Sequence, residues 1–263
     1  MSVYICPVCG GPLEREGNVY KCAERHSFDI ASSGYVNLSP PSSGSHGDDA
    51  DMVTARRAFL EGGYYSPLCE AVCEAAAASS PATLLDAGCG EGYYTERIGK
   101  AVPGCAIYGV DISKKAAEKA SKRCRGAHIC VASVYRMPYA DHSFDLVVNI
   151  FSPLSVDEYA RVIRRGGRLL LAVPEPDHLI ELKRAVYDTV NVKEMKGTEL
   201  PGFTLENEKK ISFLMDLDGQ SLQALFMMTP YYHKTSYEDK AKLGSIERLS
   251  VTASFSLFSY IKS

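Results

Sequence analysis

The 263-residue chain lacks several features that would assign it to a specialised class of protein. No apolar run approaches the roughly 20 residues that a membrane-spanning helix needs. The first ten residues, MSVYICPVCG, lack the basic stretch followed by a long apolar stretch that marks a secretory signal. Internal repeats and coiled-coil heptads are also missing. We therefore expect a globular, cytoplasmic protein.

An excess of positive charge is missing too. Lys and Arg number 29 against 32 Asp and Glu, which gives a net charge of -3 and a pI near 6.1. That balance is not typical of a nucleic-acid binder, so any contact with RNA must use local basic patches. One patch follows Asp111 and comprises Lys114, Lys115, Lys119, Lys122, Arg123 and Arg125. Another comprises Arg161, Arg164, Arg165 and Arg168. Each fits either a phosphate-contacting surface or an ordinary solvated face.

Cysteine is plentiful, and its placement is uneven. Three of the nine cysteines lie in the first 26 residues together with a histidine, as Cys6-x2-Cys9 and Cys22-x3-His26. This spacing is typical of a tetrahedral zinc site whose four protein ligands leave no open position, and hence of a structural zinc. A module this small needs such a metal because its own core is too small to stabilise it. The alternative is that no metal binds.

Composition predicts the domain boundaries. Residues 1–38 form the expected zinc-binding β module, and residues 39–51, SPPSSGSHGDDAD, form a linker rich in Ser, Gly, Pro and Asp. Residues 52–263 form the larger domain. It opens with two helices, over 52–60 and from about Tyr64 to Ala78, the second with Pro67 in its first turn.

From Ala82 onward, strand and helix patterns alternate, which predicts an α/β fold with a parallel sheet covered by helices on both faces. Strands are expected over Ala82–Ala87, Ala106–Asp111, His128–Val131, Phe144–Phe151 and Arg168–Val173. Helices are expected over Tyr93–Ala101, Lys114–Cys124, Ser155–Ile163 and His178–Thr189. A strand over Lys210–Leu217, a helix over Gln220–Met227 and a strand over Leu249–Ile261 close the chain. The last two strands are expected to pair, which gives a seven-stranded sheet with an antiparallel end.

The stretch LLDAGCGEGYY, Leu84 to Tyr94, joins the first of these strands to a helix through Gly88, Gly90 and Gly92. A dinucleotide-binding loop reads G-x-G-x-x-G, whereas this loop reads G-x-G-x-G after the acid Asp86. It resembles motif I of the class I methyltransferases, which bind S-adenosylmethionine (SAM), so Asp86, Gly88 and Gly90 are candidate SAM contacts. An ordinary tight turn between strand and helix is the alternative.

Residues at the ends of the next two strands extend this candidate cofactor site, because ligands bind at the carboxyl ends of parallel strands. Asp111 ends the second strand and is suited to accept hydrogen bonds from two ribose hydroxyls. Ser133 and Val134 leave the third strand, where such folds hold the adenine edge. A plain loop serine is the alternative for Ser133.

The fourth and fifth strands supply candidates nearer the methyl acceptor. Asn149-Ile150-Phe151-Ser152-Pro153 partly matches the Asn/Asp-Pro-Pro-aromatic motif of amino-directed methyltransferases, and we expect Asn149 to contact SAM as well. Phe151 and Tyr94 are candidates to stack on a target base, and Phe151 fits a core position equally well. His178 is a candidate to contact SAM or to shuttle a proton, with a buried or capping histidine as the alternative.

With these motifs in place, nearly the whole chain resembles the RlmA-type 23S rRNA (guanine-N1)-methyltransferases, a family that includes a tylosin-resistance branch. The resemblance is carried by the stretches CPVC, CAERHSFD, GYVNL, ARRAFL, GCGEGYYT and HLIELK. The Asn149–Pro153 segment and the acidic balance depart from the family pattern, so the acceptor guanine stays open.

The resemblance implies both site residues and a reaction. It implies SAM contacts from Tyr65, Gly90, Glu91 and His178 and zinc on Cys6, Cys9, Cys22 and His26. It also implies methyl transfer from SAM to N1 of a guanine in a hairpin loop of domain II of 23S rRNA. The enzyme would act as a homodimer whose zinc modules help to grip the RNA. Two alternatives stay open: a SAM-dependent methyltransferase for a small molecule or protein, and a non-catalytic SAM- or RNA-binding module.

Overall fold

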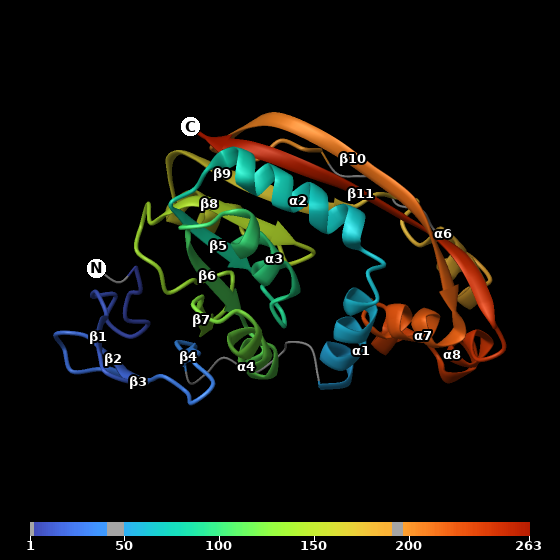
Figure 1. Cartoon of the computed structure of the whole chain (residues 1–263), viewed down its shortest axis with the longest axis horizontal. Helices are drawn as coiled ribbons and strands as arrows, with labels where there is room; N and C mark the ends of the chain where they lie inside the picture. Colours follow the sequence, from blue (N-terminus) through green and yellow to red (C-terminus); the bar gives the residue numbers. More distant parts are fainter. Residues whose placement is uncertain (1–2, 41–49, 191–196) are drawn as a thin grey trace.

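A computed structural model of the chain describes residues 3–40, 50–190 and 197–263. A three-stranded sheet lies near the N-terminus, and an eight-stranded sheet carries the larger part of the fold (Figure 1). None of the helices in these described segments combines the length and apolar character that a membrane span requires.

The small sheet consists of β1 (Glu14–Glu16), β2 (Val19–Lys21) and β3 (Ser27–Asp29), all antiparallel. Gly17 takes a φ of 62° in the tight turn between β1 and β2, a conformation that favours glycine. The next strand, β4 (Val36–Asn37), leaves this module and pairs in parallel with β7 of the large sheet. The N-terminal module and the large sheet are therefore joined by backbone hydrogen bonds.

The large sheet has the strand order β10-β11-β9-β8-β5-β6-β7-β4. Its remaining strands are β5 (Thr83–Ala87), β6 (Ala106–Asp111), β7 (His128–Val131), β8 (Phe144–Ile150), β9 (Ile163–Pro174), β10 (Phe203–Asp218) and β11 (Arg248–Lys262). Neighbours from β4 to β9 are parallel, and β11 runs antiparallel to both β9 and β10. The predicted seven strands with an antiparallel end are confirmed, and β4 adds an eighth strand at the opposite edge.

The central strands are buried on both faces, as parallel strands usually are. Successive residues alternate between two cores: Leu84, Val148 and Leu170 join one core, whereas Leu85 and Val147 join the other. α2 and α3 cover the first face, and α5 together with the N-terminal module covers the second.

The helices are α1 (Ala50–Glu61), α2 (Ser66–Ser79), α3 (Tyr93–Ala101), α4 (Lys114–Arg123), α5 (Val156–Val162), α6 (Ile180–Val186), α7 (Gly219–Met227) and α8 (Tyr237–Leu243). Figure 1 shows α1 beside α7, at the end of the long β10–β11 pair that lies away from the N-terminal module. Since α1 begins at Ala50, the last two residues of the predicted linker are helical. Linker residues 41–49 lie outside the described segments.

β10 begins at Phe203, seven residues before the predicted start at Lys210, because its pairing with β11 continues to Lys262. Three further elements differ from the prediction for local reasons. β9 begins at Ile163, five residues before the predicted start, because Ile163 already pairs with Phe144 of β8. An irregularity that contains Gly166 separates this pair from the continuous pairing that starts at Arg168. α6 is shorter than predicted, since Leu179 before it has a φ of 57° and Tyr187 after it is extended. The sequence analysis did not predict α8, a short helix capped by the Ser236 hydroxyl.

Candidate functional site

The glycine loop between β5 and α3 uses its three glycines in different ways. Gly88, Gly90 and Gly92 have φ values of 88°, 54° and 88°, in the left-handed region that costs an L-residue about 1–2 kcal/mol. A Cβ on Gly88 would lie 2.3 Å from Oγ of Ser152, and one on Gly92 would lie 2.8 Å from Sγ of Cys124. Around Gly90 the nearest described atom to such a Cβ is 4.0 Å away. Two glycines therefore permit close packing, whereas Gly90 leaves room for a ligand beside the backbone.

Asp111 closes this loop from the end of β6. Its Oδ2 accepts a 2.9 Å hydrogen bond from the Gly90 N–H, and its Oδ1 accepts a 2.8 Å bond from the Ser113 N–H. A carboxylate at the end of this strand is suited to accept hydrogen bonds from two ribose hydroxyls. The carboxylate thus stands beside the open side of the loop, where the sequence predicted a ribose contact.

Asp86 and Glu91 lie beneath the loop rather than on its open side. Asp86 is 2% exposed and accepts a 2.6 Å bond from the Thr95 hydroxyl. Burial raises the pKa of Asp86 to about 7; the Thr95 bond opposes the rise, and the negative charge of Asp111 adds to it. Glu91, also 2% exposed, pairs with the Arg123 guanidinium. Both acids anchor the loop, and their predicted contact with SAM stays a prediction.

The residues after β7 lie next to Asp111. The N–H of Ala132 donates to the Asp111 carbonyl over 3.1 Å. Ser133 Oγ accepts from the Tyr135 N–H over 3.2 Å, and Val134 is buried in the second core. The segment predicted to hold the adenine is therefore adjacent to Asp111, the acid predicted to bind the ribose. This matches a nucleoside, in which the adenine is bonded directly to the ribose.

Asn149, at the end of β8, is fully buried and organises the loop that follows it. Its Nδ2 donates to the Tyr159 hydroxyl over 2.6 Å and to the Pro153 carbonyl over 3.2 Å. Its Oδ1 accepts from the Ser152 N–H over 3.1 Å. Both amide hydrogens therefore bond within the protein, and the Asn149 side chain fixes the conformation of the loop after β8. The predicted contact between Asn149 and SAM stays a prediction.

Tyr65 and His178 meet at the same rim of the sheet, although 113 residues separate them. Tyr65 Oη lies 3.4 Å from Nε2 of His178, and Nδ1 of His178 accepts from the Ser254 N–H over 3.2 Å. Because Nδ1 is an acceptor, the proton of the neutral ring is on Nε2 and points at Tyr65. Burial, with a smaller effect of nearby Lys183, lowers the pKa of His178 to about 3. The ring is neutral and has no free lone pair, which argues against the predicted proton shuttle.

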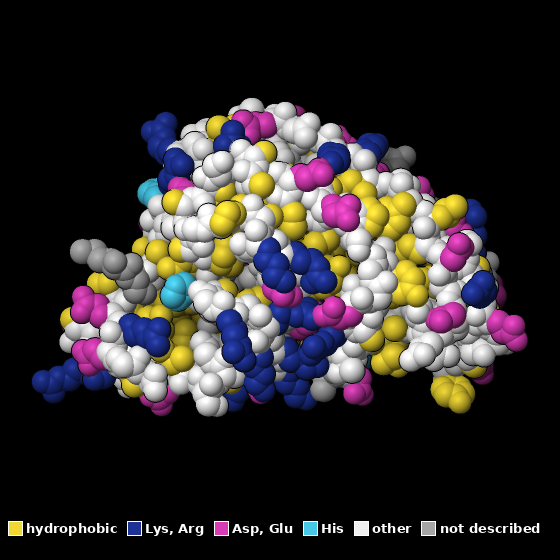
Figure 2. Space-filling view, viewed as in Figure 1, with side chains coloured by type: hydrophobic (Ala, Val, Ile, Leu, Met, Phe, Trp, Pro, Cys, Tyr) yellow, Lys and Arg dark blue, Asp and Glu magenta, His cyan; other side chains and the backbone are white. Residues whose placement is uncertain are grey.

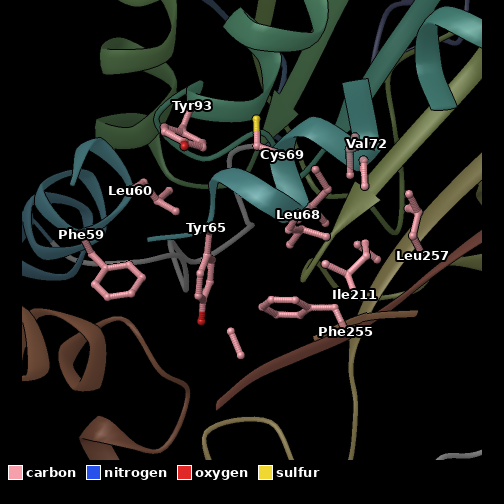
Figure 3. Packing of buried hydrophobic residues seen from close by; sticks show 14 of the residues in the cluster. Phe59, Leu60, Tyr65, Leu68, Cys69, Val72, Tyr93, Ile211, Phe255 and Leu257 are labelled. Carbon is pink, nitrogen blue, oxygen red and sulfur yellow. The ribbon is translucent and has the colours of Figure 1, made fainter. Parts of the chain in front are cut away.

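The rim also contains a residue that the sequence analysis missed. Phe255 of β11 lies 4.5 Å from the His178 ring and 5.1 Å from the Tyr65 ring, measured between centroids. Figure 3 shows Tyr65 between Phe59 and Phe255. Phe255 reaches this position because β11 pairs with β9 in a register that places it opposite Pro174. No local pattern in the sequence indicates that register.

The Cys3His cluster in the N-terminal module has the dimensions of a zinc site. A tetrahedron with Zn–S bonds near 2.3 Å has edges of about 3.8 Å between sulfurs. Sγ of Cys9 and Sγ of Cys22 are 3.7 Å apart, and Nδ1 of His26 lies 3.6 Å from Sγ of Cys6 and 3.3 Å from Sγ of Cys22. All four ligand atoms lie within 4.8 Å of one another. The donor set fits a structural zinc with four protein ligands.

The module that holds this cluster packs directly on the large sheet. Tyr4 stacks on Tyr139 at 5.3 Å between ring centroids and meets Tyr20 and Tyr108 edge-on. Cys6 and Cys22 belong to the same buried cluster as Leu85 of β5. The cysteine ligands therefore share a core with the strand that leads into the glycine loop. The predicted division into residues 1–38, 39–51 and 52–263 stays a prediction.

Two segments of the chain match known protein families. Residues 4–43 match the zinc-ribbon family described as RlmA, N-terminal, and residues 85–171 match the family described as methyltransferase domain. The first match contains all four cluster ligands, and the second contains the glycine loop, Asp111 and Asn149.

Full-length relatives extend these matches. The 23S rRNA (guanine(748)-N(1))-methyltransferase of Streptomyces fradiae is 32% identical over 235 residues, which covers 86% of this chain and 84% of the relative. YxjB of Bacillus subtilis, assigned as a 23S rRNA (guanine-N1)-methyltransferase, is 34% identical over 248 residues, which covers 87% of this chain and 86% of YxjB. Among solved structures, the YcgJ protein of Bacillus subtilis has a TM-score of 0.47 and 20% identity, covering 68% of this chain and 91% of that one.

Proposed function

Because the chain belongs to the RlmA-type 23S rRNA (guanine-N1)-methyltransferase family, we propose that it transfers a methyl group from SAM to N1 of a guanine in a hairpin loop of domain II of 23S rRNA. The observation that carries the SAM-dependent chemistry is the contact between Asp111 and Gly90. This contact places the predicted ribose-binding acid, Asp111, next to Gly90, whose backbone leaves room for a ligand. The substrate is supported by the names of the relatives.

SAM supplies a methyl group on a positively charged sulfur, which is already a good leaving group, so the protein has mainly to align the two reactants. In the transfer, the sulfur–methyl bond breaks as a bond from guanine N1 to the methyl carbon forms. The N1 proton must leave as well. The glycine loop, Asp111 and the Ser133–Val134 segment would hold the nucleoside part of the cofactor beside the ends of β5, β6 and β7.

Tyr65 and His178 would act as hydrogen-bond donors in this site. Neutral His178 donates from Nε2 toward the Tyr65 oxygen, which leaves the phenol hydrogen available for a ligand. Burial raises the pKa of Tyr65, so its hydroxyl stays protonated at neutral pH. A buried phenol donor suits a carboxylate, and SAM offers one on its methionine part. His178 then serves as a positioning residue and not as the base that removes the N1 proton.

The basic surface near α4 is the proposed RNA-binding face. Figure 2 shows Lys and Arg side chains gathered on the lower part of the molecule, where Figure 1 draws α1 and α4. Lys114, Lys115 and Arg57 are exposed there. In the second basic group, by contrast, Arg161, Arg164 and Arg168 each pair with an acid. In the α4 group Lys122 and Arg123 are paired as well, with Glu118 and Glu91, whereas Lys114 and Lys115 have no acid within ion-pair distance among the described residues. Exposed cations gain more from phosphate contact than cations that are already paired, so Lys114 and Lys115 favour the α4 face.

Replacement of both lysines by glutamate, K114E/K115E, tests this face. Affinity for a domain II transcript should fall and its dependence on salt should weaken, because fewer phosphates are neutralised. Lys210→Glu on β10 is the control, since Lys210 is exposed and reversal of its charge alters another surface. Equal losses in both variants would refute the assignment.

The proposal also includes a structural zinc ion, a homodimeric assembly and a cytoplasmic location. Zinc on Cys6, Cys9, Cys22 and His26 would stabilise the N-terminal module and take no part in the chemistry, because the protein supplies all four ligands. The family resemblance supports a homodimer, which light scattering of the purified protein tests. A 23S rRNA substrate would place the reaction in the cytoplasm, with the ribosome.

The decisive assay mixes the purified protein with SAM carrying a labelled methyl group and a domain II transcript. N1-methylguanine should form in the transcript and should disappear with Asp111→Ala. Free metabolites and cell proteins serve as competing acceptors. Label in those acceptors but not in RNA would favour the alternative of a small-molecule or protein methyltransferase. Binding of SAM without transfer to any acceptor would favour the non-catalytic alternative.

A further inference from the structure

Phe151 is a partly exposed aromatic residue at the end of β8, beside the candidate cofactor site. It directly follows β8, whose residues Leu146 to Ile150 are all buried, yet it is 45% exposed. Its φ is 60°, a value that is uncommon for any residue other than glycine and unusual for a bulky one. Strained backbone of this kind persists where the surroundings force it, and it gathers at functional sites.

The surroundings of Phe151 do force this conformation. The Phe151 N–H donates to the Ala172 carbonyl of β9 over 3.4 Å, and the next residue, Ser152, donates its N–H to Asn149. Asn149 is itself fixed by Tyr159. On the other side, Ser152 packs against Gly88, where only a glycine leaves enough space. The loop that carries Phe151 is thus fastened to the glycine loop of the cofactor site.

One side of the ring faces the site, and the exposed part is left for a ligand. The Phe151 ring lies 5.3 Å from Phe255 and 6.3 Å from Tyr65, at interplanar angles of 38° and 63°. These are the same two aromatics that surround His178. An exposed aromatic ring so close to a cofactor site offers a flat apolar surface to an incoming base.

We propose that the exposed face of Phe151 is the stacking platform for the acceptor guanine, held beside the methyl donor by the forced conformation of the loop. This proposal rests on the proposed function, because it needs a nucleobase acceptor. Tyr94, the other aromatic candidate from the sequence, does not fill this role. Its hydroxyl is buried, and its ring packs against Tyr93 at the start of α3.

The test compares Phe151→Leu, Phe151→Tyr and Phe151→Gly with the wild type. Three quantities are measured: methylation of a domain II transcript, SAM affinity by calorimetry, and thermal stability. Loss of a base–aromatic stack costs roughly 5- to 150-fold in kcat/KM for RNA. We expect that loss for F151L and F151G with SAM affinity within about twofold of wild type. F151Y should retain most of the activity, because its ring still stacks.

Phe151→Gly also separates stacking from folding. Glycine adopts positive φ without strain, which offsets part of the packing lost with the ring, so this variant should stay folded at the assay temperature while losing RNA methylation. Leu154→Ala, on the same loop and also exposed, is the control for a general apolar contact and should stay near wild type.

Each outcome has one meaning. Wild-type activity of F151L, or an equal loss in L154A, would overturn the stacking role. A parallel loss of SAM affinity would overturn it too, by assigning the ring to the cofactor pocket. If the wild-type protein itself methylates no RNA, the proposed function fails, and the stacking proposal fails with it.

Discussion

Gly88→Ala should destabilise the fold through one identifiable contact. At a φ of 88°, an alanine costs about 1–2 kcal/mol of backbone energy. Its Cβ would also lie 2.3 Å from Oγ and 2.4 Å from Cβ of Ser152, closer than atoms can approach. Overpacking of this kind costs about 1–3 kcal/mol. The sum is a loss of about 2–5 kcal/mol in the free energy of unfolding, or roughly 4–20 °C in Tm for a chain of this size.

A double-mutant cycle isolates the contact between the two loops. Ser152→Gly removes both clashing atoms, which leaves the Ser152 Cα at 3.7 Å, an ordinary contact distance. The double variant G88A/S152G should therefore recover the overpacking part, about 1–3 kcal/mol, but not the backbone part. Urea unfolding of the four proteins gives the coupling energy.

Gly90→Ala is the matched control for backbone strain alone. Its φ is 54°, but no described atom lies closer than 4.0 Å to the added Cβ. It should cost only the backbone part, about 1–2 kcal/mol, and Ser152→Gly should not rescue it. Additive effects of G88A and S152G, with no coupling, would refute the packing of the β8 loop on the glycine loop.

Three further predictions follow from the site. Asp111→Asn should weaken SAM binding about 10- to 100-fold by calorimetry, because it removes a charged hydrogen-bond acceptor, while far-ultraviolet circular dichroism stays unchanged; unaltered affinity would exclude Asp111 from the cofactor site. Removal of zinc by a chelator, or His26→Ala, should lower the Tm of the whole protein in one transition, because the ligands Cys6 and Cys22 share a core with β5; a separate low-temperature transition would contradict that coupling. The free energy of unfolding of the cofactor-free protein should fall as pH rises from about 4 to about 7, and Asp86 should contribute at most about 1.4 kcal/mol per pH unit. The reason is the raised pKa of Asp86, which means that the folded state binds a proton on this carboxyl more tightly than the unfolded state does. Asp86→Asn should flatten this pH dependence, and an unchanged slope would show that Asp86 is not its source.

Local patterns were enough to predict much of this fold. The strands β6 and β7 and the helix α3 have the predicted bounds, because each combines a clear apolar period with a glycine or polar boundary. The spacing of the cysteines and histidine predicted a cluster that the structure brings within zinc-binding distance. These features depend on residues close together in the chain.

Features that depend on distant residues could not be predicted. Phe255 and Ser254 stand behind His178 only through the register of β11 on β9, about 80 residues away in the sequence. β4 is two residues long and carries no strand pattern of its own, so its place at the sheet edge comes from tertiary pairing. Side-chain orientation is also hidden from the sequence: Asn149 has the right chemistry for a ligand, and Tyr159 and Pro153 accept hydrogen bonds from both of its amide hydrogens. Residue type and strand end do not tell which way such a side chain is turned.

The central claim is methyl transfer to guanine N1 in domain II of 23S rRNA, and mass mapping of that RNA tests it most directly. Domain II rRNA from cells with and without the protein is digested and compared, together with a strain that carries Asp111→Ala. We predict one N1-methylguanine, in a hairpin loop, that is present only with the wild-type protein. Identical methylation in all three strains would contradict the account.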